Sequence, residues 1–223
     1  MNRPLLVLGT LVFAVLVFFI GRSMIDQSPP SAVNAEPAGT NEASTANSAL
    51  IRPYSPILGP ENAPVTIVEF FDPACESCRA MHPVLAEIRE QYPDQVRIIM
   101  RYAAFHDGSD IAVRILETAR RQNLFEPVLE ALLEAQPQWA DHSGAKLDIA
   151  WEAAKAAGLD IDKARQEMNS VDINNVLTQD AADIETINVR QTPTFFVDGL
   201  PLLDFGVEPL KEMVRKHVES ARK

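Results

Sequence analysis

The sequence contains few cysteines and no recognisable phosphate-binding or metal-binding motif. Only two of its 223 residues are cysteine, Cys75 and Cys78. Two cysteines cannot form the several disulfides of a small secreted scaffold, nor supply the four thiolates of an all-cysteine zinc site. The four histidines are scattered without metal-ligand spacing, and no glycine-rich phosphate loop or nucleophilic serine motif occurs. We therefore expect no metal and no cofactor, but the two cysteines form one C-x-x-C pair.

Basic residues are also scarce. The chain has 20 Lys and Arg against 31 Asp and Glu, which gives a formal net charge of −11. Nucleic-acid-binding proteins carry basic faces, and attachment to anionic lipid requires polybasic segments. The charge balance therefore argues against nucleic acid as a partner and against electrostatic attachment to membranes.

An uncharged apolar stretch near the N-terminus predicts a membrane anchor over residues 1–22. Residues 4–21 are apolar and lie between Arg3 and Arg22. As a helix they reach roughly 27 Å, close to the hydrocarbon thickness of about 30 Å. No small-residue cleavage site follows directly, although Val33-Asn34-Ala35 lies downstream, so a cleaved signal peptide is the alternative. The charges at the N-terminus favour its cytoplasmic placement in a bacterial inner membrane. The domain then faces the periplasm or cell exterior, and cleavage would leave it soluble in the periplasm.

A polar segment separates this stretch from the rest of the chain. Residues 27–48 are rich in Ser, Ala, Asn, Pro and Thr and include no aromatic residue. Such a segment cannot bury enough apolar area to offset the entropy lost on ordering. We predict a flexible linker over residues 23–52 and a folded domain over residues 53–223.

The sequence of the domain predicts an α/β fold. Residues 65–71 and 96–102 are β-branched and aromatic or apolar on both faces, as in covered strands, and an amphipathic helix to about Gln91 lies between them. A strand–helix–strand unit of this length has parallel strands. The remaining predicted elements are helices over 110–123, 124–136, 146–157, a short segment from Asp160 and 171–188, then strands 194–197 and 200–203 joined by Asp198-Gly199, and a helix over 207–222.

The C-x-x-C pair begins a helix directly after a strand. A helix N-terminus carries partial positive charge and free N–H groups, which stabilise a thiolate at Cys75. We predict that Cys75 is the more exposed nucleophile. Cys78, one turn into the helix, would resolve the mixed disulfide. A structural disulfide and half of a metal site are the alternative interpretations.

Two segments together resemble the DsbA-like thiol-disulfide oxidoreductases. They are residues 59–88, which contain the cysteine pair, and residues 188–202, which contain Thr192-Pro193 and the predicted hairpin. The resemblance implies a thioredoxin-like fold with an inserted helical subdomain over about 106–171. It also implies a cis Thr192–Pro193 bond beside the redox centre, protein substrates with thiols or disulfides, and a membrane redox partner that recycles the cysteine pair.

Glu69 and Ser77 are informative within this resemblance. Glu69 lies in an apolar strand, at the position of the family's buried acid that relays protons to the resolving cysteine; a glutamate that reaches solvent is the alternative. Strong oxidants of the family carry histidine where this chain has Ser77. The absence of this histidine predicts that the Cys75–Cys78 redox couple is more reducing than the couples of those strong oxidants, unless His82 supplies the missing charge.

We therefore predict an extracytoplasmic thiol-disulfide oxidoreductase, with the direction of electron flow open. The alternatives are a Cu(I)-handling protein that uses the two thiolates as ligands and a partner-binding protein with inert cysteines.

Overall fold

The computed structural model describes residues 48–141 and 143–222. The predicted anchor and most of the predicted linker lie outside these residues. Within the described ranges, no helix combines the length and apolar character needed to cross a membrane.

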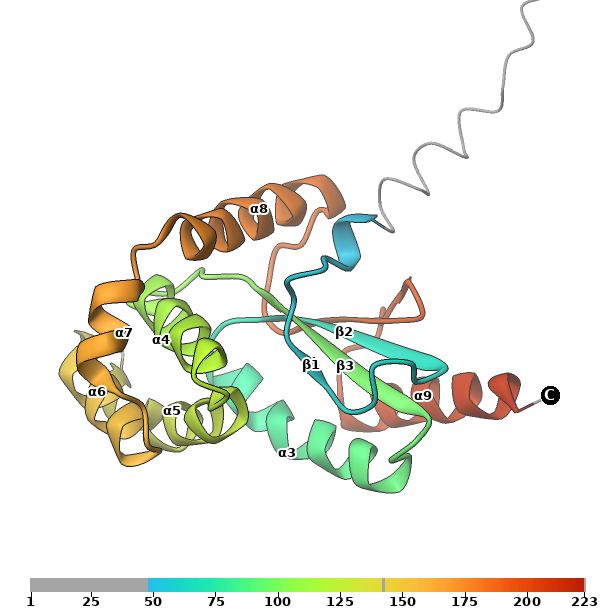
Figure 1. Cartoon of the computed structure of the whole chain (residues 1–223). Coiled ribbons are helices and arrows are strands. Elements are labelled where there is room, and N and C mark those ends of the chain that lie inside the picture. Colours follow the sequence, from blue (N-terminus) through green and yellow to red (C-terminus); the bar gives the residue numbers. More distant parts are fainter. Residues whose placement is uncertain (1–47, 142, 223) are drawn as a thin grey trace, which may run out of the picture. The chain divides into compact units, whose positions relative to one another are not determined.

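The order of elements agrees with the predicted β-α-β unit, helical block and β-β-α unit (Figure 1). The elements are β1 (Ile57–Leu58), β2 (Val65–Phe71), α3 (Glu76–Gln91), β3 (Val96–Tyr102), α4 (Ser109–Arg121), α5 (Phe125–Trp139), β4 (Ala140–Asp141), β5 (Gly144–Ala145), α6 (Leu147–Ala156), α7 (Ile161–Glu167), α8 (Val171–Ile187), β6 (Thr194–Val197), β7 (Leu200–Pro201) and α9 (Val207–Ala221).

The central strand β2 organises the main sheet, whose order is β1-β3-β2-β6-β7. It pairs in parallel with β3, as predicted, and antiparallel with β6. All seven residues of β2 are buried, which explains why its sequence is apolar on both faces. Pro201 lies in the edge strand β7, where its missing N–H leaves no ladder bond unmade.

Helices cover both faces of this sheet. Ile67, Phe71 and Ile98 point into a core shared with α3, α9 and the helical block, whereas Val68 and Phe70 pack toward α8. Figure 1 shows α3 and α9 on one face of the sheet and α8 on the other. The carboxyl ends of β2 and β3 are left to carry the loops that form the site.

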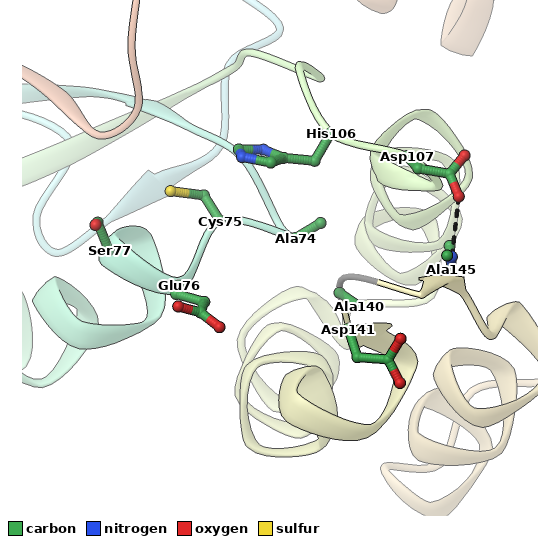
Figure 2. A pocket seen from close by; sticks show the side chains of 10 residues that line it. Ala74, Cys75, Glu76, Ser77, His106, Asp107, Ala140, Asp141 and Ala145 are labelled. Atoms are coloured by element: carbon green, nitrogen blue, oxygen red, sulfur yellow. Dashed lines mark hydrogen bonds between the residues drawn. The ribbon is translucent and has the colours of Figure 1, made fainter.

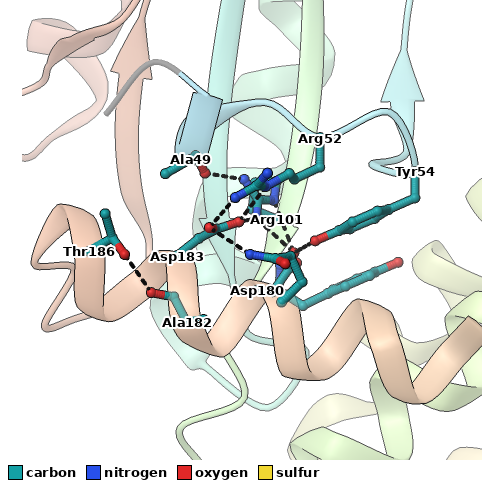
Figure 3. Close-up of polar contacts among 10 residues, drawn as sticks. Ala49, Arg52, Tyr54, Arg101, Asp180, Ala182, Asp183 and Thr186 are labelled. Atoms are coloured by element: carbon teal, nitrogen blue, oxygen red, sulfur yellow. Dashed lines mark hydrogen bonds and ion pairs between the residues drawn. The ribbon is translucent and has the colours of Figure 1, made fainter. Parts of the chain in front are cut away.

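A buried ionic cluster joins α8 to the sheet and to the start of the described chain (Figure 3). Arg101 of β3 is fully buried and donates to Asp180 and Asp183 of α8, both at 2.7 Å. Arg52 pairs with Asp183, and the Tyr54 hydroxyl donates to Asp180 at 2.6 Å. Five polar side chains far apart in sequence thus satisfy one another, which a buried charge requires.

The packed part of the chain extends further toward the N-terminus than residue 53. Ala49 and Leu50 are 2% and 4% exposed, and the Ala49 carbonyl accepts from Arg101. Residues 49–52 therefore belong to the folded unit, although the composition of this region predicts a linker. Their order comes from distant contacts, namely the ionic cluster and the packing of Leu50 in the apolar core on the α8 face of the sheet.

Three short strands, β1, β4 and β5, are not predicted from the sequence. Each has two residues, so no alternation of polar and apolar side chains marks it. The other elements have the predicted type, with bounds that differ by a few residues at most.

Candidate active site

The C-x-x-C pair lies at the junction of β2 and α3. Cys75 is the N-cap residue of α3, and its following residues begin the helix. Both cysteines are free thiols. Cys75 is 7% exposed and Cys78 is not exposed, so the predicted order of exposure holds, although Cys75 is more covered than predicted. The loop before β6 covers it, with the Thr192 carbonyl oxygen 3.2 Å from the Cys75 sulfur.

The environment of Cys75 favours its thiolate. A hydrogen bond from the Cys78 thiol has the largest effect and burial opposes it. The Thr192 side chain and the N–H groups of Cys78 and Ser77 add further stabilisation, and together these lower the pKa of Cys75 to about 5. Both N–H groups belong to the first turn of α3, where main-chain donors have no acceptor within the helix, as predicted from the position of the motif.

Cys78 has the opposite environment. Burial raises the pKa of the Cys78 thiol well above its usual value, with further contributions from its hydrogen bond to Cys75 and the charge of Glu69. The Asp72 main-chain N–H lies 3.4 Å from the Cys78 sulfur and favours the thiolate only weakly. At neutral pH the pair therefore consists of one thiolate and one thiol.

Glu69 lies in the centre of β2 and is 1% exposed. Its Oε1 atom has no hydrogen-bond partner among the described residues. Burial, and to a lesser degree the charge of Cys75, raise the pKa of Glu69 to about 8. The side chain is therefore buried as predicted, and it is a proton-holding group near neutral pH.

Thr192 and Pro193 complete the immediate surroundings of Cys75. The peptide bond between them is cis, which the resemblance implies.

A pocket of about 420 Å³ opens beside the Cys75 sulfur. The active-site loop, the loop after β3 and the β4–β5 hairpin line it (Figure 2). Its rim includes the acidic side chains of Glu76, Asp107 and Asp141, so a substrate segment meets negative charge beside the nucleophile.

Sequence reasoning missed three residues of this site: Asp72, His106 and Gln136. Gln136 of α5 donates to the main-chain carbonyls of Pro73 and Cys75, at 2.8 and 3.0 Å, and so holds the active-site loop against the helical block. Nothing local distinguishes this glutamine. Asp72 and His106 did carry a signal, because residues that follow neighbouring parallel strands meet at one edge of the sheet.

His82 does not occupy the position of the missing histidine. It lines a separate small pocket with Glu126 and Glu130 of α5. Burial lowers the pKa of His82, which favours its uncharged ring. In the described ranges there is also no group of three or more His, Cys, Asp or Glu side chains arranged to hold a metal ion.

Comparison with known proteins gives one family match. A family model described as thioredoxin matches residues 52–214. A Na(+)/H(+) antiporter NhaA of Herminiimonas arsenicoxydans is 29% identical over 143 residues, which cover 64% of this chain and 22% of the antiporter. Other antiporter relatives are covered to at most 30%, so the chain spans less than a third of their length.

Two further relatives have names that refer to redox chemistry. A putative protein-disulfide oxidoreductase of Rickettsia conorii is 22% identical over 171 residues, covering 74% of this chain and 61% of that protein. The solved structure of a thioredoxin-like oxidoreductase from Silicibacter pomeroyi is 26% identical with a TM-score of 0.66, covering 80% of this chain and 96% of that one.

Proposed function

We propose that this chain, which belongs to the thioredoxin family and has its α/β fold, is a protein thiol-disulfide oxidoreductase. One observation carries the proposal: Cys75 has a pKa of about 5, whereas burial keeps Cys78, three residues away, protonated. Such a pair separates the nucleophile from the resolving thiol. The two oxidoreductase relatives support the same activity.

In the proposed reaction, the Cys75 thiolate attacks a sulfur atom of a substrate disulfide. A bond forms between the two sulfurs, the substrate disulfide breaks, and the released thiolate takes up a proton. Cys78 then loses its proton to the ionised form of Glu69, which is the minor form near neutral pH, and attacks the Cys75 sulfur. The disulfide between Cys75 and the substrate breaks, and the second substrate sulfur leaves as a thiolate that takes up a proton. The products are the Cys75–Cys78 disulfide and a substrate dithiol, and the reverse sequence oxidises a substrate.

A turnover assay tests this activity. Reduced protein should reduce a model protein disulfide, and oxidised protein should introduce disulfides into a reduced, unfolded protein. The relative rates of the two assays and the measured reduction potential of the Cys75–Cys78 couple give the direction of electron flow, which the geometry does not determine. Turnover no faster than that of free dithiol in both assays would contradict the proposal.

The acidic rim suggests the substrate class. Glu76, Asp107 and Asp141 surround the pocket, although Asp141 is paired with Lys146. We infer that segments with lysine or arginine near the reactive cysteine react faster than acidic ones, and that the difference falls with added salt.

The location and the partner are part of the same proposal. The apolar stretch over residues 4–21 supports a membrane anchor with the domain on the extracytoplasmic side, and a membrane redox partner would recycle the cysteine pair. Ion antiport is not carried over from the antiporter relatives, because the chain spans less than a third of their length.

Titration of the reduced protein with Cu(I) tests the alternative function. Two thiolates can bind this soft ion. Tight Cu(I) binding together with no disulfide turnover would favour metal handling.

A further inference from the structure

The loop after β3 places an imidazole beside the redox centre. His106 and Cys75 line the same pocket, and Figure 2 shows the ring of His106 directed toward the Cys75 sulfur. The two residues are 31 positions apart in sequence and come from the ends of neighbouring parallel strands. His106 therefore lies close to Cys75, as a histidine between the two cysteines would, although it is not part of the C-x-x-C motif.

Asp72 holds this imidazole in place. Its carboxylate is fully buried and its Oδ2 atom accepts from the main-chain N–H groups of Phe105 and His106, at 2.8 and 3.0 Å. The His106 Nδ1 atom lies 2.7 Å from the same oxygen. The other carboxylate oxygen accepts from the Ala74 N–H and from the Ser109 hydroxyl. One carboxylate thus fastens the active-site loop to the loop that carries the histidine.

This arrangement fixes the protonation of one ring nitrogen. Main-chain N–H groups only donate, so Oδ2 of Asp72 acts as an acceptor, and Nδ1 of His106 must carry a proton. The second ring nitrogen, Nε2, is the atom that gains or loses a proton. The His106 side chain is half exposed, so solvent can exchange that proton.

The charged groups that contact His106 or line the same pocket are mostly negative. They are Asp72 after β2, Cys75 at the start of α3, Glu76 in α3, Asp107 in the same loop and Asp141 of β4, which is paired with Lys146. Burial opposes the charged ring, but the hydrogen bond and charge of Asp72 and then the charge of Cys75 raise the pKa of His106 above its usual value. The imidazolium is therefore the form that this surrounding favours.

We propose that His106, oriented by Asp72, is a positioning residue that supplies the positive charge opposite the Cys75 thiolate. It takes the electrostatic role that a histidine between the cysteines would have, from a separate loop. The proposal deepens the proposed function and rests on it only in treating Cys75 as the nucleophile. The ion pair exists at pH values between the pKa of Cys75 and the higher pKa of His106. Above that range it weakens because the ring loses its proton.

The test compares reduced wild type with His106→Asn, His106→Lys and His217→Asn. Asparagine can keep the hydrogen bond to Asp72 but cannot carry charge, whereas lysine keeps the charge. His217 is a matched control, because its Nδ1 atom also lies 2.7 Å from a carboxylate oxygen, that of Asp198. Asp198 pairs with Thr66 at the opposite end of β2, far from Cys75.

Two measurements are made on each protein: the ultraviolet absorbance of the thiolate against pH, and the equilibrium with glutathione. Because Cys78 remains protonated, the first thiolate to form is that of Cys75. We expect His106→Asn to raise the pKa of Cys75 by about one unit, equivalent to about tenfold less thiolate. The equilibrium should shift about tenfold toward the disulfide, or roughly 30 mV more reducing. His106→Lys and His217→Asn should remain near wild type.

Two results would overturn the inference. One is a His106→Asn protein whose thiolate titration and glutathione equilibrium match those of His217→Asn. The other is an equal shift in His106→Asn and His106→Lys, which would show that the charge is not the cause. The thiolate titration requires no disulfide exchange, so absent turnover of protein substrates in wild type would count against the proposed function and leave this readout intact.

Discussion

Cys75 and Cys78 have identical side chains three residues apart, yet the pKa of Cys75 is lowered and that of Cys78 is raised. The first accepts hydrogen bonds from the start of α3, and the second lies wholly inside the core. The difference arises from position on one helical turn, which is why it was predictable from the sequence. It also assigns separate roles that single substitutions can distinguish.

We predict that Cys75→Ser abolishes disulfide turnover, whereas Cys78→Ser accumulates a mixed disulfide with substrate. The first variant has no nucleophile, and the second cannot resolve the intermediate. Non-reducing electrophoresis and mass spectrometry of the trapped species measure both outcomes. Faster alkylation of Cys78 than of Cys75 in the reduced wild type would reverse the roles.

Glu69 predicts a pH dependence of stability. Its pKa is about 8 in the folded protein, against an ordinary value near 4.5. Between these values the folded state holds a proton that the unfolded state has lost, so its contribution to stability falls as pH rises from about 5 to 8. Below this range both states are protonated, and above it both are ionised.

Glu69→Gln should remove this fall. We expect the free energy of unfolding of the variant, relative to wild type, to increase by a few kcal/mol between pH 5 and pH 8. Urea denaturation of both reduced proteins at several pH values measures the difference, and other titrating groups cancel in it. A constant difference across this range would show that Glu69 is ionised already at pH 5.

Local sequence gave no sign of the contacts of Gln136, and for Asp72 and His106 it indicated only that both follow neighbouring parallel strands. The Asp72–His106 pair spans 34 positions and the bond from Gln136 to Cys75 spans 61. Such contacts depend on which loops meet when the sheet forms. By contrast, Cys75, Cys78 and Glu69 were identified from a strand, a helix start and the motif itself.

At the scale of elements, helix α8 is held to the sheet by charge as well as by apolar packing. Arg101 is fully buried between Asp180 and Asp183, and its removal leaves two buried carboxylates without their main partner. Breaking a buried ion pair by removing one member costs about 3–5 kcal/mol. This cost sets a strong expectation for one substitution.

We predict that Arg101→Leu lowers the free energy of unfolding by about 3–5 kcal/mol. Arg215→Ala is the control, since Arg215 also pairs with two carboxylates, Glu212 and Glu219, but on the exposed surface of α9. It should cost at most about 1 kcal/mol. Denaturant titration measures both, and equal losses would mean that the buried cluster contributes no more than surface pairs do.

Most elements were predictable because their hydrophobic period is long enough to be recognised. Strands β2 and β3 have the bounds that their sequences predict. The start of the folded unit was not predictable, because residues 49–52 directly follow a polar segment and are ordered by distant partners in β3 and α8. Tertiary contacts there override the local composition.

At the scale of the whole molecule, the sequence predicts a chain tethered to a membrane. The apolar stretch over residues 4–21 has no adjacent cleavage site. We expect the mature protein to keep its N-terminus and to remain with membranes after alkaline carbonate extraction. N-terminal sequencing of the extracted and soluble fractions checks this, and a soluble form that begins near Glu36 would contradict it.

The edge strands of the sheet also affect how the protein tolerates crowding with its own copies. Both edges, β1 and β7, are only two residues long, and β7 contains Pro201. Short edges and proline offer few free main-chain donors and acceptors to a strand from another molecule. The fold therefore disfavours aggregation by strand pairing between molecules, even at high local concentration of the protein.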